Sequence, residues 1–164
     1  MRQLLTLTTC TLVAGIALAA DAPARKSGLW ELTNSMEGPR AMQTTMQACV
    51  DAKSDQWASQ SADMQKNCSK NAVSHSAGVV TVDSVCSFNG TTASTHAEFR
   101  GDFDSNYRGD IHTTYTPPMH GMKDSRFSIA ARWLGPCKPG MKPGDMLMPG
   151  GMKFNRSELP QPPQ

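Results

Sequence analysis

The stretch that decides the fold is residues 79–100, VVTVDSVCSFNGTTASTHAEFR, in which two alternating runs flank Asn89-Gly90. This dipeptide is typical of a two-residue type I′ hairpin turn, because both central residues of that turn adopt positive φ. The turn fixes the register of the two strands. It places Val80, Val82, Ser84 and Cys86 opposite Phe99, Ala97, Thr95 and Ala93. This shared face is mostly apolar and the other is polar, so the sequence predicts a half-buried antiparallel hairpin.

Similar alternation continues on both sides of this hairpin. Four more stretches carry apolar residues at every second position, as half-buried strands do: residues 28–36, 42–50, 107–115 and 127–133. Residues 51–67 instead fit a short helix, with Trp57 and Met64 on one face and Asp51 as its cap. The sequence therefore predicts a mainly β fold, a curved antiparallel sheet or half-open barrel of about six or seven strands with one short helix.

Residues 1–19 have the pattern of a cleavable export signal. Arg2 precedes an apolar stretch, and Ala17-Leu18-Ala19 has the small-x-small pattern of a cleavage site. The apolar run is too short for a membrane span, which needs about 20 residues, so we expect no transmembrane segment in the mature chain. These features predict export to the periplasm.

The rest of the chain fits one domain. We expect residues 20–27 to be disordered, residues 28–137 to form the β domain, and residues 138–164 to be a coil tail rich in proline, glycine and methionine. The chain has 16 basic and 14 acidic residues without a basic cluster, which argues against a nucleic-acid partner. Because only 6% of residues are aromatic, we expect disulfides to add stability to a thin core.

Four cysteines remain once the signal is removed, and four cysteines allow three pairings. A hairpin about Ala77 would bring Cys68 opposite Cys86, which leaves Cys49 to pair with Cys137. We favour these two structural disulfides. A zinc site with four cysteine ligands is the alternative, but the chain has no Cys-x-x-Cys pair to support it.

Gly28-x-Trp30-Glu31, followed by Cys49, Cys68, Cys86 and finally Gly135-x-Cys137, forms an ordered set of motifs. In this set the chain resembles a family of small exported bacterial proteins that carry a domain of unknown function. The resemblance covers residues 28–137. It implies an extracytoplasmic compartment and a shared fold, and it implies no catalytic residue.

Methionine is frequent, with 11 in the chain, and several lie in glycine- and proline-rich segments near a histidine. Thioether and imidazole groups on an exported segment suit Cu(I), which is a soft ion. The candidate ligands are Met119, His120, Met122, Met146, Met148 and Met152. The alternative is that these methionines are adaptable apolar contacts.

A second candidate site lies on the polar face of the predicted sheet. The hairpin register places Asp83 opposite His96, and the next strand would bring His112 beside His96. Such a patch can bind a divalent cation or transfer a proton, as in a metal-dependent enzyme. Solvated cross-strand pairs are the alternative interpretation.

No nucleophile elbow, metalloprotease helix, phosphate loop or dinucleotide fingerprint occurs in the chain. We therefore interpret it as a non-enzymatic periplasmic protein without a cofactor. It would bind a small apolar ligand or an envelope protein, and copper handling and the metal-dependent enzyme are the alternatives. Small residues on the dry face would leave room for the ligand, namely Ala93, Thr95, Ala97, Gly109 and Thr113.

Overall fold

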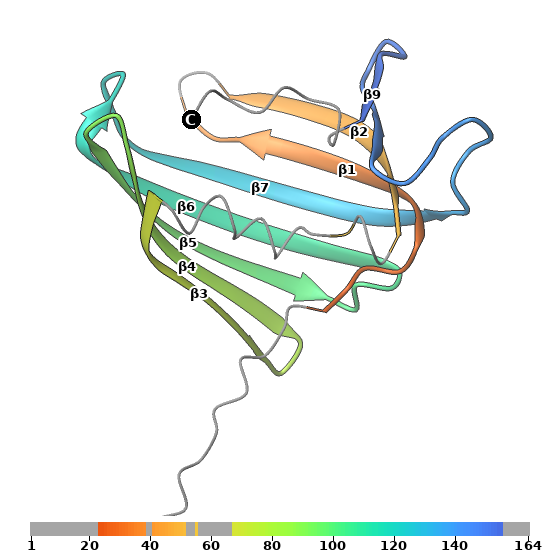
Figure 1. Cartoon of the computed structure of the whole chain (residues 1–164), viewed down its shortest axis with the longest axis horizontal. Coiled ribbons are helices and arrows are strands. Elements are labelled where there is room, and N and C mark those ends of the chain that lie inside the picture. The colour runs from red at the N-terminus through yellow and green to blue at the C-terminus, as the bar shows by residue number, and fades with distance from the viewer. Residues whose placement is uncertain (1–22, 39–40, 52–54, 56–66, 156–164) are drawn as a thin grey trace, which may run out of the picture.

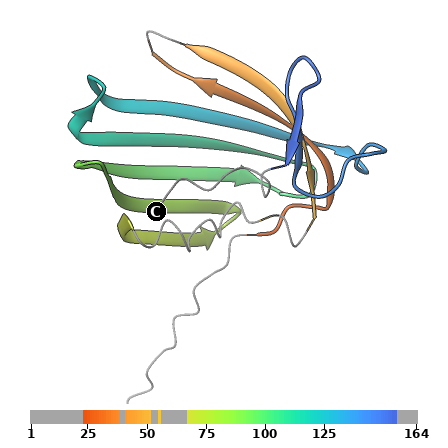
Figure 2. The ribbon, with the colours of Figure 1, turned by 45° about the horizontal axis from the view of Figure 1, so that its top comes forward.

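The computed structural model describes residues 23–38, 41–51, 55 and 67–155. They form one nine-stranded antiparallel sheet in the order β3-β4-β5-β6-β7-β1-β2-β8-β9 (Figure 1). The strands are β1 Gly28–Met36, β2 Met42–Val50, β3 Cys68–Ser76, β4 Val79–Phe88, β5 Thr91–Gly101, β6 Asn106–Met119, β7 Met122–Gly135, β8 Asp145–Leu147 and β9 Lys153–Asn155. The sheet is curved and open, with β3 and β9 as its edges (Figure 2).

The predicted fold class is confirmed, and the predicted register of the central hairpin is confirmed with it. Val80 faces Phe99 and Asp83 faces His96 across β4 and β5. The structure adds β8 and β9 to the six or seven strands predicted. Both are only three residues long and lie in a segment rich in glycine and proline, so the sequence did not indicate them.

Three two-residue turns join neighbouring strands with positive φ at both central residues. They are Ala77-Gly78, Asn89-Gly90 and His120-Gly121. This geometry matches the right-handed twist of the strands that it joins, so these turns favour the pairing of β3 with β4, β4 with β5 and β6 with β7. His120, a predicted copper ligand, is thus the first central residue of a tight turn, a position that histidine tolerates better than most residues.

One face of the sheet, which we call the inner face, carries the hydrophobic core at one end. Trp30 is fully buried there, and its ring lies 5.7 Å from that of Tyr107, which in turn stacks on Phe103 at 5.3 Å. The cluster of buried residues is completed by Leu32, Ala48, Val50, Val80 and Ala131. We call this the core end. The opposite face, the outer face, is mostly polar.

Gly28 begins β1 at a point where no side chain fits. A Cβ atom there would lie 2.4 Å from the carbonyl oxygen of Gly135 and 2.5 Å from Nε1 of Trp133. Trp30 of the same motif is fully buried in the core, and Glu31 pairs with the exposed Arg132 at 2.9 Å on the outer face. Each fixed position of the Gly-x-Trp-Glu motif therefore makes a defined contact, which is buried for Gly28 and Trp30 and solvated for Glu31.

Residues 20–27 form a stretch for which the sequence predicts disorder; its described part forms no strand but makes specific contacts. The carbonyl of Lys26 accepts a hydrogen bond from Trp30 Nε1 at 2.8 Å, and the carbonyl of Ser27 accepts one from Trp133 Nε1 at 3.1 Å. The Lys26 ammonium also lies 3.9 Å from the centre of a Trp133 ring. Polar composition suggested disorder, but the buried indole N–H of Trp30 and the partly exposed one of Trp133 need acceptors, and this segment supplies them.

Arg25 and Asp55 form an ion pair at the core end. The Arg25 side chain is only 10% exposed and that of Asp55 is inaccessible. Nη2 and Nε of Arg25 donate to Asp55 Oδ1 at 2.6 and 2.9 Å, its backbone N–H donates to Oδ2 at 2.7 Å, and Nη1 donates to the Tyr107 hydroxyl at 3.2 Å. Burial disfavours the charge on Arg25, but its contacts with Asp55 outweigh this effect, so the pKa of Arg25 is raised.

Most of the helix predicted for residues 51–67 lies outside the described residues, and so do Trp57 and Met64. Within the described part, the Asp55 N–H donates to the Asp51 carbonyl at 2.8 Å, a spacing of four residues. The export signal at residues 1–19 also lies outside the described residues and stays a prediction.

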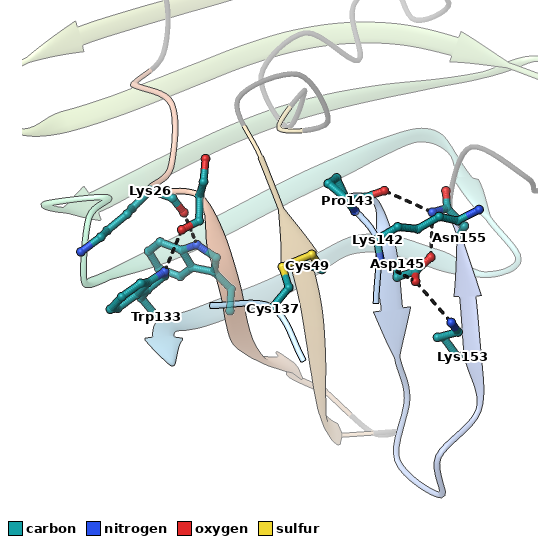
Figure 3. The surroundings of a disulfide bond; sticks show 11 residues. Lys26, Cys49, Trp133, Cys137, Lys142, Pro143, Asp145, Lys153 and Asn155 are labelled. Carbon is teal, nitrogen blue, oxygen red and sulfur yellow. Dashed lines mark hydrogen bonds and ion pairs between the residues drawn. A yellow bond between two sulfur atoms is a disulfide. The ribbon is translucent and has the colours of Figure 1, made fainter. Parts of the chain in front are cut away.

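The coil predicted for residues 138–164 is wrong for residues 145–155, where β8 and β9 form a hairpin that extends the sheet from β2 (Figure 3). Asp145, only 2% exposed, organises this hairpin. Its carboxylate accepts bonds from the Lys142 N–H at 2.9 Å and the Asn155 amide at 2.8 Å, and Lys153 lies 3.4 Å away. These contacts explain order in a segment whose composition suggested a coil.

The cysteines pair as Cys49–Cys137 and Cys68–Cys86, which is the connectivity favoured from the sequence. The first bridge joins β2 to the chain just beyond β7, at the core end (Figure 3). The second joins the edge strand β3 to β4, where a register shift follows Cys68. Each bridge therefore ties a peripheral segment to the central strands.

Candidate ligand-binding face

The inner face continues past the core as a second apolar surface, which we call the open half. Four large side chains of this surface come from β1, β6 and β7, are only partly buried, and lie outside the core cluster. They are Met36, Ile111, Tyr115 and Phe127. Strand pairing holds three of them side by side, because Phe127 is the partner of both Ile111 and Met36, whereas Tyr115 is the partner of Ala93.

A few hydroxyl groups lie among the apolar side chains of the open half. Thr95 and Thr113 hydrogen-bond across β5 and β6 at 2.8 Å, and the Tyr115 hydroxyl lies 3.0 Å from that of Ser125. An apolar surface with a few fixed polar groups is the usual composition of a small-molecule site. These hydroxyls can orient the polar end of a largely apolar ligand.

The small residues expected to leave room on the dry face do so only in part. Gly109 is covered, because the Phe99 ring and the Ile129 side chain occupy the space that a Cβ atom at Gly109 would need. Ala97 is buried as well, between Val82 and Ile111 on the neighbouring strands. Space for a ligand is thus restricted to the open half, beside Ala93, Thr95 and Thr113.

The polar patch on the outer face is assembled as the sequence suggested. Asp83, His96 and His112 lie in one row across β4, β5 and β6. His96 Nδ1 lies 2.8 Å from Asp83 Oδ1, and this hydrogen bond is the main reason that the pKa of Asp83 is lowered. Both histidines line two shallow cavities of about 340 and 290 Å³.

The patch does not form a metal centre in this arrangement. His96 Nε2 faces Glu98 at 3.8 Å, whereas His112 Nε2 faces Asp124 at 3.7 Å. Within the described part of the chain, no three histidine, cysteine, aspartate or glutamate side chains are grouped so that they could hold a metal ion. All three patch residues are substantially exposed, as solvated cross-strand pairs are.

The candidate copper ligands fall into two separate groups. Met119, His120 and Met122 lie at the β6–β7 turn, whereas Met146, Met148 and Met152 belong to the β8–β9 hairpin at the other end of the sheet (Figure 1). Met146 packs against the core cluster. The structure does not bring the two groups together, so copper binding stays a prediction for each group alone.

The model of the family described as a protein of unknown function (DUF3617) matches residues 25–137. The chain belongs to this family. The match begins at Arg25 and ends at Cys137, so the DUF3617 domain contains β1 to β7, both disulfides and the buried arginine, but not the β8–β9 hairpin. Neither the curated proteins nor the solved structures contain a match to this chain.

In the described part of the DUF3617 domain, sequence reasoning did not find the buried ion pair of Arg25 and Asp55. Both residues lie in polar stretches, and no local pattern links positions 30 residues apart. Among the residues described, no helix is long and apolar enough to cross a membrane.

Proposed function

We propose that this protein is an exported, non-enzymatic binding protein that holds a small apolar ligand on the open half of its inner face. The observation that carries the proposal is the division of that face. One end is closed by the core, while Met36, Ile111, Tyr115 and Phe127 remain partly exposed beyond it. Partly exposed apolar side chains aligned on a curved sheet offer a surface that a ligand can complete.

The architecture also suits a permanent binding surface. Hydrogen-bonded strands and locked turns hold the open half rigid, so little conformational entropy is lost on binding. The hydroxyls of Thr113 and Tyr115 offer the few polar contacts that such a ligand needs. A molecule with an alkyl chain and a polar end fits this combination best.

The covalent chemistry supports an extracytoplasmic compartment. Disulfides persist in oxidising environments of this kind and are rare in the cytosol. The signal pattern of residues 1–19 supports export, and we propose the periplasm as the compartment.

The experiment is a titration with a fluorescent fatty acid whose emission rises in an apolar environment. Ala93→Phe fills the open half and should weaken probe binding by at least about tenfold, while Ile111→Gln should weaken it by removing apolar surface. Ala130→Phe is the matched control, because Ala130 is exposed on the outer face. Equal probe affinity in all four proteins would exclude the open half as the site.

A further inference from the structure

The turns at one end of the sheet carry exposed apolar side chains. This end, which we call the hairpin end, holds the β4–β5 and β6–β7 turns and the first residue of β2 (Figures 1 and 2). Phe88 and Met122 flank the two turns and are each 45% exposed, and Met42 is 61% exposed. Apolar groups of this size are costly to leave in water, and gathered at one end of a molecule they indicate contact with another apolar phase.

The geometry of the three side chains favours a broad surface over a groove. They come from three different strand pairs, β1–β2, β4–β5 and β6–β7, and the register places Phe88 and Met42 on the inner face and Met122 on the outer face at this end of the sheet. Beside the β6–β7 turn, the exposed Pro117 and Pro118 belong to β6, and the exposed Lys123 and Asp124 belong to β7. Apolar side chains on separate turns, flanked by charges of both signs, suit the boundary between lipid headgroups and acyl chains.

The hairpin end is also the end toward which the open half extends. Phe88 lies on the inner face, in the same alternating series of β4 as Val80, Val82 and Cys86. An apolar ligand that leaves a bilayer at this end would reach the open half without crossing the core. We propose that the hairpin end docks on the surface of a lipid bilayer, with Phe88, Met122 and Met42 entering the headgroup region. This inference rests on the proposed function, since it names the source of the ligand.

The test is co-sedimentation of the mature protein with vesicles of phosphatidylethanolamine and phosphatidylglycerol. The triple variant Met42→Gln, Phe88→Gln, Met122→Gln should bind the vesicles at least about tenfold more weakly, because three apolar contacts are lost. Met152→Gln is the matched control. Met152 is 70% exposed but lies in the β8–β9 hairpin, away from the hairpin end, so it should leave vesicle binding unchanged.

Two further measurements are the salt dependence of vesicle binding and the oligomeric state of the variants. Docking through apolar side chains should keep most of its strength at high ionic strength, whereas attraction through Lys123 alone would be screened. The inference is overturned if the unaltered protein does not bind vesicles or if the triple variant binds as well as Met152→Gln. It is also overturned if the triple substitution instead abolishes a dimer, since the hairpin end would then be a protein interface.

The fluorescent fatty-acid titration, carried out without vesicles, separates this inference from the proposed function. If the protein binds the probe but does not bind vesicles, the proposed ligand site stands and the proposed membrane docking is wrong. Loss of vesicle binding in the triple variant with normal probe binding would support both.

Discussion

Arg25 and Asp55, 30 residues apart in the chain, form an ion pair that is almost inaccessible to solvent, with Nη2 of the arginine 2.6 Å from Oδ1 of the aspartate. The pair joins the segment before β1 to the connection between β2 and β3, and Arg25 also donates a hydrogen bond to the Tyr107 hydroxyl. The match to the DUF3617 family begins at this arginine. The pair therefore closes the core end of the inner face.

Breaking this pair should be costly. Asp55→Ala leaves the Arg25 charge buried without its partner, and we expect the free energy of unfolding to fall by about 3–5 kcal/mol, as for other buried pairs. Urea denaturation followed by circular dichroism measures this. The control is Glu31→Ala, which removes the more exposed pair with Arg132 and should cost less than about 1 kcal/mol. Equal effects of the two substitutions would contradict the structural role of the Arg25–Asp55 pair.

The two disulfides should contribute unequally. Cys49–Cys137 closes a loop of 88 residues and Cys68–Cys86 one of 18. Loop-closure entropy then gives about 4.5 kcal/mol for the longer loop and about 3 kcal/mol for the shorter. Denaturation of the double variants Cys49→Ser/Cys137→Ser and Cys68→Ser/Cys86→Ser should show the first to be less stable, and the reverse order would refute the ranking. Thiol counting on the exported protein should find no free cysteine among these four.

The glycine of the Gly-x-Trp-Glu motif should not tolerate a methyl group. Gly28→Ala forces a Cβ atom against the Gly135 carbonyl and the Trp133 indole at a positive φ, so we expect a loss of about 2 kcal/mol or more. Gly38→Ala is the matched control. Gly38 also has a positive φ but open space around it, so only the backbone cost of about 1 kcal/mol should appear. Thermal unfolding of both variants decides whether the close approach matters.

The β8–β9 hairpin should loosen in acid. Hydrogen bonds from the Lys142 N–H and then the Asn155 amide lower the pKa of Asp145 below its ordinary value of 3.8. A lowered pKa in the folded state means that the stabilisation is fully present above the ordinary value and is lost as the pH falls through the lowered one. The methyl resonance of Met146 should therefore shift in acid, and Asp145→Asn should abolish this dependence. A resonance that titrates equally in the variant would contradict this assignment.

The fold was largely predictable because its signals are local. Asn89-Gly90 fixes one turn, and alternation in the flanking residues fixes which face is dry, so the pairing of Val80 with Phe99 followed directly. A predicted hairpin about Ala77 likewise placed Cys68 opposite Cys86 and so predicted their disulfide. The β8–β9 hairpin escaped prediction because Asp145 holds it through turn contacts, without any alternating run of useful length.

The candidate site was less predictable for a physical reason. Sequence alternation identifies which residues share the dry face, but not which part of that face is packed. Gly109 looked like free space until the Phe99 ring was seen to fill it. The division of the inner face into a core and an open half depends on Arg25 meeting Tyr107, which is 82 residues away in the sequence and stacks on Phe103, and no periodicity encodes that contact.

Native mass spectrometry of the protein purified from its own host tests the central claim most directly. The account predicts a fraction of protein carrying a lipid-sized apolar molecule, which Ala93→Phe reduces and Ala130→Phe does not. Protein that is consistently empty in both variants and in the unaltered chain, and that also fails to bind the fluorescent fatty acid, would contradict it.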